Sequence, residues 1–335
     1  MKHAILAIAA AAVFAAPGAE AADPIQLKFG FPAPPTSWVN TKGATPFAKA
    51  VEKDSGGLVE IKIFGGGQIG NFSNIYDRTL SGIADMSFGT TGSIAGTFAK
   101  SNVTSVPFEA DRSLETSIAY WRLYEKGVIA DEYEKVKPLA LFTFSSSGMH
   151  TTKPIKSADD MKGLKLGATS KMTADALVLL GATPVTVTPA ETYQAISRGL
   201  VTGANMSWPG VQVFKLFEVA KYHLDLPFGL GPAFFFMNKE SYAKLPEKAR
   251  KAIDAHSGIG LTKQLGTAAD QEEQTIRERV KTMPEQMLAV LTAEEKARWK
   301  RTLAPVTEAW VKATPDGARV LAAFRAELER ARAGM

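Results

Sequence analysis

Residues 157–210 constrain the fold of this chain most, because strand patterns and helix patterns alternate in them. Strands are expected at 164–168, 183–187 and 201–208, and helices at 171–180 and 189–199. Ser170 is placed to cap the first helix and Gly181 to end it, while Thr188 and Glu191 form a capping box for the second. Strands joined by helices through such short connections predict a parallel sheet with right-handed crossovers.

The carboxyl ends of these strands predict where a ligand binds. In open sheets of parallel strands, ligands sit in a crevice outside those ends. This rule places five residues beside the crevice, namely Gly167, Ala168, Asn205, Met206 and Trp208.

The region from residue 25 to residue 88 repeats the same plan. Apolar residues alternate at 25–31 and 59–63, as in strands with one buried face, helices are expected at 45–56 and 73–81, and a third strand at 84–88. The third strands resemble each other, since Asp85-Met86-Ser87-Phe88-Gly89 and Asn205-Met206-Ser207-Trp208-Pro209 each follow a glycine that ends a helix. The sequence therefore predicts an α/β protein of two similar lobes.

Two segments are expected to connect the lobes. The small, polar run Ser145-Ser146-Ser147-Gly148 predicts a hinge crossing, and a strand at 234–237 is expected to cross back. From Pro246 onward nearly all of the chain has helical patterns, which predicts long helices that brace both lobes. The predicted divisions are a leader at 1–21, a first lobe of 22–147 with 233–265, and a second lobe of 148–232 with 266–335.

The first 21 residues predict a cleavable export signal. Lys2 and His3 precede an apolar run at 4–16, and Ala19-Glu20-Ala21 is a cleavage site of the A-x-A kind. The apolar run is too short to span a bilayer. The net charge of +5 comes from cations scattered among glutamates, which argues against a nucleic-acid partner. We therefore expect a periplasmic protein, and we expect it to be a monomer.

The sequence contains no pattern typical of catalysis or of a metal site. It has no cysteine, and its histidines His150, His223 and His256 lie far apart without metal-ligand spacing. Residues 65–70 match G-x-G-x-x-G, but no helix opens inside the motif, so a dinucleotide site is rejected. We expect no enzymatic activity, no cofactor and no metal.

Four motifs follow one another along the chain. They are Asp159-Asp160-Met161-Lys162-Gly163-Leu164-Lys165-Leu166, Leu180-Gly181-Ala182-Thr183-Pro184-Val185, Glu191-Thr192-Tyr193-Gln194-Ala195-Ile196 and Gly199-Leu200-Val201-Thr202-Gly203. Together they resemble the DctP family of solute-binding proteins from TRAP (tripartite ATP-independent periplasmic) transporters. The resemblance implies two α/β lobes hinged around a ligand cleft, as in type II periplasmic binding proteins. It also implies capture of a small organic solute and its delivery to TRAP-type permease subunits for uptake driven by an ion gradient. A periplasmic ligand sensor of the same fold is the alternative.

The sequence departs from the family pattern at two positions. The family usually has one arginine after the K-G-L-K-hydrophobic strand and a second after the first hinge crossing, where this chain has Gly167 and about Met149. A guanidinium is the usual partner of a carboxylate, and a buried carboxylate without one is costly. We therefore expect a neutral, aromatic or amine-bearing solute, with a carboxylate held by backbone amides as the alternative. The expected ligand-binding residues are Phe31, Trp38, Asn71, Phe88, Thr90, Thr91, Met149, His150, Gly167, Ala168, Asn205, Met206, Trp208 and Phe234.

Overall fold

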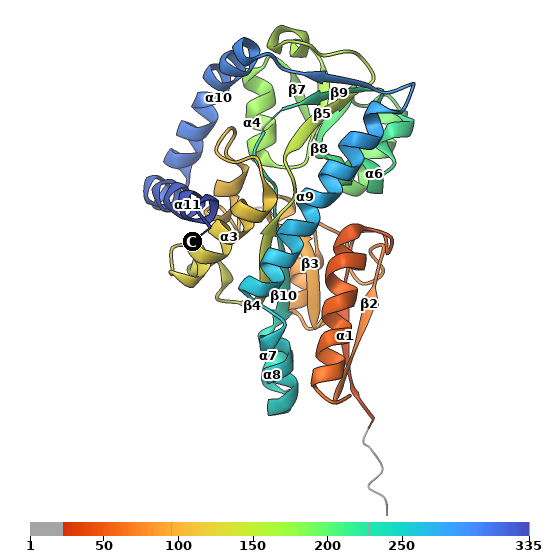
Figure 1. Ribbon diagram of the computed structural model, residues 1–335, viewed down its shortest axis with the longest axis vertical. Helices are drawn as coiled ribbons and strands as arrows, with labels where there is room; N and C mark the ends of the chain where they lie inside the picture. Colours follow the sequence, from red (N-terminus) through yellow and green to blue (C-terminus); the bar gives the residue numbers. More distant parts are fainter. Residues whose placement is uncertain (1–22, 95, 227, 335) are drawn as a thin grey trace, which may run out of the picture.

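The computed structural model describes residues 23–94, 96–226 and 228–334, so the predicted export signal at 1–21 lies outside the described residues. Two sheets form the centres of two lobes (Figure 1). The first has the strand order β2-β1-β3-β10-β4 and the second the order β11-β9-β5-β8-β6-β7. The predicted two-lobed α/β architecture is confirmed.

The first lobe is built on strands that are buried on the face toward its helices. Its strands are β1 (Ile25–Gly30), β2 (Val59–Phe64), β3 (Met86–Thr90), β4 (Val136–Thr143) and β10 (Pro232–Asn238), and its helices are α1 (Thr45–Asp54), α2 (Ile75–Leu80), α3 (Ser113–Glu125), α7 (Lys239–Ala243) and α8 (Glu247–Ala255). Strand β1 is parallel to β2 and β3, whereas β10 is antiparallel to β3 and β4.

The second lobe repeats this arrangement. Its strands are β5 (Ser147–Thr151), β6 (Lys165–Ala168), β7 (Thr183–Thr186), β8 (Gly203–Ser207), β9 (Tyr222–Asp225) and β11 (Met287–Val290), and its helices are α4 (Lys171–Leu179), α5 (Thr192–Ser197) and α6 (Trp208–Val213). Strand β6 is parallel to β7 and β8, whereas β5 is antiparallel to β8 and β9. The order β2-β1-β3-β10-β4 thus corresponds to β7-β6-β8-β5-β9.

Local signals in the sequence set most boundaries of these elements. The Ser170 Oγ accepts a hydrogen bond of 3.2 Å from the Thr173 N–H, and Gly181 has a φ of +76° just beyond α4. The capping box of Thr188 and Glu191 is also present. The predicted third strand, however, ends at Ser207, and Trp208 opens α6. Pro209 favours this helix start, because a first helical turn needs no proline N–H.

Each sheet contains one strand, β10 or β5, that directly follows a crossing between the lobes and runs antiparallel to both of its neighbours. The chain leaves the first lobe between β4 and β5 and returns between β9 and β10, as the sequence predicts. A long helix, α9 (Ile259–Lys281), then runs along both lobes (Figure 1). It packs on α3 and β4 of the first lobe and on α6 and β11 of the second. This helix therefore connects both lobes, as the predicted bracing role of the C-terminal helices requires.

The last two helices contact different lobes. Helix α10 (Ala293–Ala313) packs on α4 of the second lobe, and α11 (Gly317–Arg332) packs on α3 of the first. The predicted division assigns both to the second lobe, so the packing of α11 differs from that assignment. Among the described residues, every helix is too short or too polar to cross a lipid bilayer.

Candidate functional site: a cleft between the lobes

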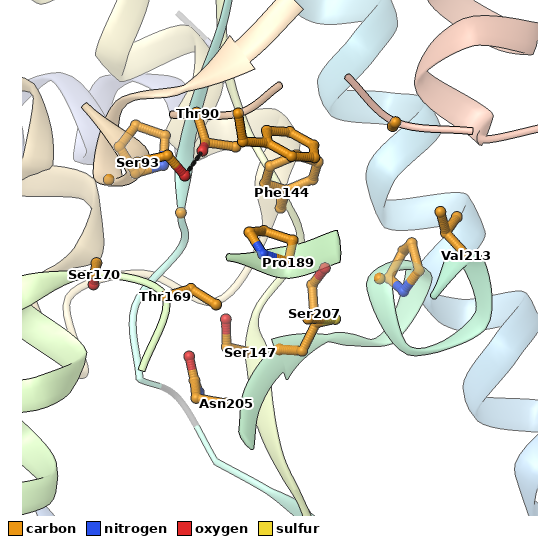
Figure 2. Close-up of a pocket in the computed structure, with 18 of the residues that line it drawn as sticks. Thr90, Ser93, Phe144, Ser147, Thr169, Ser170, Pro189, Asn205, Ser207 and Val213 are labelled. Atoms are coloured by element: carbon orange, nitrogen blue, oxygen red, sulfur yellow. Dashed lines mark hydrogen bonds between the residues drawn. The ribbon is translucent and has the colours of Figure 1, made fainter. Parts of the chain in front are cut away.

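Both lobes line a cavity of about 130 Å³ at the carboxyl ends of the strands (Figure 2). The first lobe contributes the β1–α1 loop and the end of β3, and the second contributes the β6–α4 and β8–α6 turns. The segments that connect the lobes complete the lining. The lobes approach each other closely beside it, since a Cβ added to Gly92 would lie 3.2 Å from the Cβ of Ser170. The position of the cavity agrees with the rule for ligand crevices in α/β proteins.

Aromatic side chains form one wall of the cavity. They are Trp38, Phe72, Phe88 and Phe144 from the first lobe and Phe214 and Phe228 from the second. Phe88 is held from behind by Phe31, whose ring is stacked on it with a centroid distance of 4.7 Å. Phe72 and Phe144 meet the same ring edge-on, at 5.9 Å and 6.4 Å. Such offset and edge-on contacts fix the rings in place and leave a flat apolar surface.

Hydroxyl and amide groups form the polar part of the lining. They belong to Ser37, Thr90, Ser93, Ser105, Ser147, Thr169, Ser170, Thr173, Asn205 and Ser207. Figure 2 shows Ser147, Thr169 and Asn205 reaching toward the same region of the cavity. Within the described part of the chain, no lysine, arginine, histidine, aspartate or glutamate lines this cavity. The site is therefore polar without being charged.

The amino end of α4 faces this polar region. Thr169 and Ser170 follow directly on β6, and both line the cavity together with Thr173. A helix start carries a partial positive charge and unpaired N–H groups. This end of the cavity can therefore hold a partial or full negative charge without a basic side chain.

The glycine-rich turn after β2 supports the loop that carries Trp38. The Gly66 N–H donates to the Ala33 carbonyl at 2.8 Å. A Cβ on Gly65 would lie 2.7 Å from the Cγ of Pro35, so only glycine permits this close approach. Gly66 and Gly67 have φ values of +66° and +82°, which favour glycine. The motif thus shapes the wall of the cavity from behind.

The structure brings five of the residues predicted to bind ligand into the cavity lining. They are Trp38, Phe88, Thr90, Asn205 and Met206. The Asn205 Nδ2 donates to the Gly148 carbonyl at 3.3 Å, and the Thr90 and Ser93 hydroxyls lie 2.7 Å apart. The amide of Asn205 therefore ties β8 to β5 while it faces the cleft.

The other predicted residues lie outside the cavity lining. They are Phe31, Asn71, Thr91, Met149, His150, Gly167, Ala168, Trp208 and Phe234. Phe234 stacks on Phe236 at 3.8 Å within the first lobe, and the Thr91 hydroxyl donates to Asn102 at 2.9 Å. Asn71 accepts from the N–H groups of Ser73 and Asn74, so its side chain caps the turn before α2. Strand alternation explains several of these positions, because neighbouring side chains point to opposite faces.

Gly167 lies in a closely packed part of the second sheet. A Cβ there would lie 2.9 Å from Val187 Cγ2 and 3.0 Å from Ala204 Cβ. The residues around it leave no room for a side chain. The close packing of the sheet therefore explains the glycine at this position without any role in ligand binding.

His150 and His223, distant in the sequence, form a buried pair. They are register partners on β5 and β9, and their Nδ1 atoms lie 2.8 Å apart. The His150 Nε2 donates to the carbonyl of Met206 at 2.9 Å. Burial, and then the neighbouring His223 ring, lowers the pKa of His150 to about 3, and burial also lowers the pKa of His223. The pair is thus neutral at pH 7 and fixes the backbone at Met206, a residue of the cavity lining.

Sequence reasoning missed this pair because strand register, not chain proximity, creates it. The described residues contain no group of three or more histidine, cysteine, aspartate or glutamate side chains that could hold a metal ion. Sequence reasoning also missed Ser37, Phe72, Phe144, Phe214 and Phe228 as residues of the lining. The helix-start signal at Ser170 was the clearest available pointer to that side of the cavity.

Residues 32–313 match the family model described as bacterial extracellular solute-binding protein, family 7, the DctP family. This chain belongs to that family. Over 315 residues it is 25% identical to the C4-dicarboxylate-binding periplasmic protein DctP of Rhodobacter capsulatus, with 91% of each chain covered. The expectation of a solute-binding protein rather than an enzyme is confirmed.

Two solved structures are similar over most of this DctP-family chain. One is a TRAP solute-binding protein from a marine metagenome, described as specific for aromatic acid ligands and bound to 3-hydroxybenzoate; it has 26% identity, a TM-score of 0.87, and coverage of 92% of this chain and 98% of that one. The other comes from Rhodoferax ferrireducens T118 and holds copurified benzoate; it has 28% identity, a TM-score of 0.87, and the same coverage. They support the fold described above.

Proposed function

We propose that this protein captures an aromatic monocarboxylate in the cleft between its lobes and delivers it to a TRAP-type permease. The observation that carries this proposal is the composition of the cavity lining. It combines aromatic rings with hydroxyl groups, and within the described residues it has no charged side chain. Pockets of this composition suit flat, largely apolar ligands with few polar groups.

The size of the cavity supports a ligand with a single ring. Its volume is about 130 Å³. A protein cavity of about 150 Å³ is known to bind benzene. One six-membered ring with a small substituent is therefore the ligand of matching size.

The charge of the lining argues for one carboxylate at most. A dicarboxylate would bury two charges without a lysine or arginine beside them, which costs several kcal/mol. A cationic amine would likewise find no acidic side chain in the described lining. A single carboxylate can use the hydroxyls of Thr169 and Ser170 and the amino end of α4.

This proposal narrows the expectation of a neutral, aromatic or amine-bearing solute. It keeps the aromatic part and adopts the alternative of a carboxylate held by backbone amides, to which it adds the hydroxyls of Thr169 and Ser170. The similar proteins that bind 3-hydroxybenzoate and benzoate support this choice. The leader pattern at 1–21 and the family together support a periplasmic location.

Calorimetric titration of the chain from residue 22 onward tests the proposal. We expect benzoate to bind with micromolar or tighter affinity, and benzamide, which has the same shape without the charge, to bind at least about tenfold more weakly. Benzylamine and succinate should bind more weakly still. Equal affinities for benzoate and benzamide would remove the carboxylate from the proposal, and preferential binding of succinate would overturn it.

A further inference from the structure

The hydroxyl of Ser37 is the least explained polar group of the cavity. Ser37 lines the cavity from the first lobe, and only 2% of the residue is exposed. Among the described residues, its Oγ has no hydrogen-bond partner. Buried hydroxyls are nearly always paired, so such a group in a binding site calls for an explanation.

The local backbone explains why the hydroxyl is left over. A serine before a helix usually caps it by accepting an N–H with its side chain. A helical turn follows Ser37, and there the N–H groups of Asn40 and Thr41 donate to the Ser37 carbonyl at 3.0 Å. The side chain of Ser37 therefore does not cap them. The Ser37 N–H in turn donates to Pro34 at 3.0 Å. The backbone of Ser37 is thus satisfied within its own turn, and its hydroxyl is left without a partner among the described residues.

The loop that carries Ser37 is held from several sides. The Asn40 Nδ2 donates to the Pro35 carbonyl at 2.7 Å, and Gly66 donates to Ala33. The ring of Pro35 rests against Gly65. A hydroxyl on such a fixed loop is already positioned for a ligand, which reduces the entropy lost on binding.

Four other hydroxyls of the lining are paired with one another inside the protein. Thr90 and Ser93 lie 2.7 Å apart, and Ser170 and Thr173 lie 3.0 Å apart. Ser37 differs from both pairs, because it lines the cavity and its hydroxyl has no partner among the described residues.

We propose that the Ser37 hydroxyl binds a second polar substituent of the solute, a hydroxyl group on its ring. This inference rests on the proposed function. In it, the amino end of α4 in the second lobe holds the carboxylate, and Ser37 in the first lobe binds the ring hydroxyl. The protein then selects hydroxylated aromatic acids over unsubstituted ones, because benzoate would leave the buried hydroxyl unpaired.

The test compares benzoate with the three hydroxybenzoate isomers on the wild type and on Ser37→Ala. We expect the wild type to prefer at least one isomer over benzoate by about fivefold or more. In Ser37→Ala that preference should fall to about one, because alanine has no hydroxyl to bind the ring substituent. A wild type without preference, or a variant that keeps it, would overturn the inference.

Ser145→Ala is the matched control. Ser145 is also a fully buried serine whose Oγ has no partner among the described residues, but it lies outside the cavity lining. Any effect on hinge motion changes the affinities for both ligands alike, so the preference for hydroxybenzoate over benzoate should keep its wild-type value.

If no aromatic acid binds, the proposed function and this inference both fail. If the acids bind and Ser37→Ala leaves the preference unchanged, only the role of Ser37 fails.

Discussion

The two lobes have the same strand topology, but they place different kinds of side chain at the cleft. Strands β3 and β8 occupy equivalent places, but Phe88 and Trp208, which match in the sequence motifs, do not: Phe88 lies within β3, whereas Trp208 follows the end of β8. Phe88 lies in a cluster of phenylalanine rings and forms part of the cavity wall. Trp208 opens α6 instead and packs on the rings of His150 and His223, at 5.0 Å and 5.4 Å. Residues that match in the two sequence motifs thus take different structural places, one in the cavity wall and one in the interior.

The serines that precede these two aromatic residues show the reverse. In the first lobe Ser87 is fully buried and hydrogen-bonded to the Thr79 hydroxyl at 2.7 Å. In the second lobe Ser207 lines the cavity. The first lobe supplies most of the aromatic wall, and the second supplies most of the polar groups. The comparison teaches that a repeated topology can build a cleft with two different sides.

The largest expected effect concerns the aromatic wall. Phe88→Ala should lower the free energy of unfolding by about 3–5 kcal/mol, because it leaves a cavity among several packed rings. Urea denaturation of the free protein measures this change. Phe88→Leu is the control, and it should lose much less because most of the volume stays filled. A loss below about 1 kcal/mol for Phe88→Ala would mean that the wall is not a rigid unit.

The second expected effect concerns the histidine pair. Because the pKa of His150 is lowered to about 3 in the folded protein, the unfolded chain binds more protons below pH 6.5. Stability should therefore be constant with respect to this group above pH 6.5 and fall on acidification, by about 2 kcal/mol at pH 5.

The variant His150→Gln isolates this effect. Its amide can still donate to the Met206 carbonyl, but it does not titrate. Denaturation curves at pH 7 and pH 5 should show a smaller pH-dependent loss in the variant than in the wild type. An equal loss of stability between pH 7 and pH 5 in both proteins would mean that other groups cause the acid sensitivity. The buried histidine pair would then not distinguish the second lobe from the first.

The smallest expected effect concerns Gly167. Gly167→Ala should destabilise the protein by about 1–2 kcal/mol, since its methyl group would press on Val187 and Ala204. The affinity for solute should change less than twofold, because Gly167 does not line the cavity. Gly260→Ala in α9 is the control, where a Cβ would meet no atom within 4 Å. A strong loss of affinity without loss of stability would place Gly167 in the binding site after all.

The sequence by itself determined the local elements and their order. The predicted helix at 171–180 corresponds to α4, Lys171–Leu179, because its cap at Ser170 and its end at Gly181 act over a few neighbouring residues. The repeat of strands and helices followed from the same short-range signals. The predicted crossings between the lobes also followed from local composition and apolar runs.

Tertiary structure decided which side chains meet. The pair of His150 and His223 depends on the register of two antiparallel strands, and the loop that carries Ser37 packs against a glycine turn from another part of the chain. Trp208 was expected at the crevice but is buried, because a helix begins there and turns its ring inward. These outcomes rest on contacts between segments far apart in the chain, and local patterns carry no information about how such segments pack together.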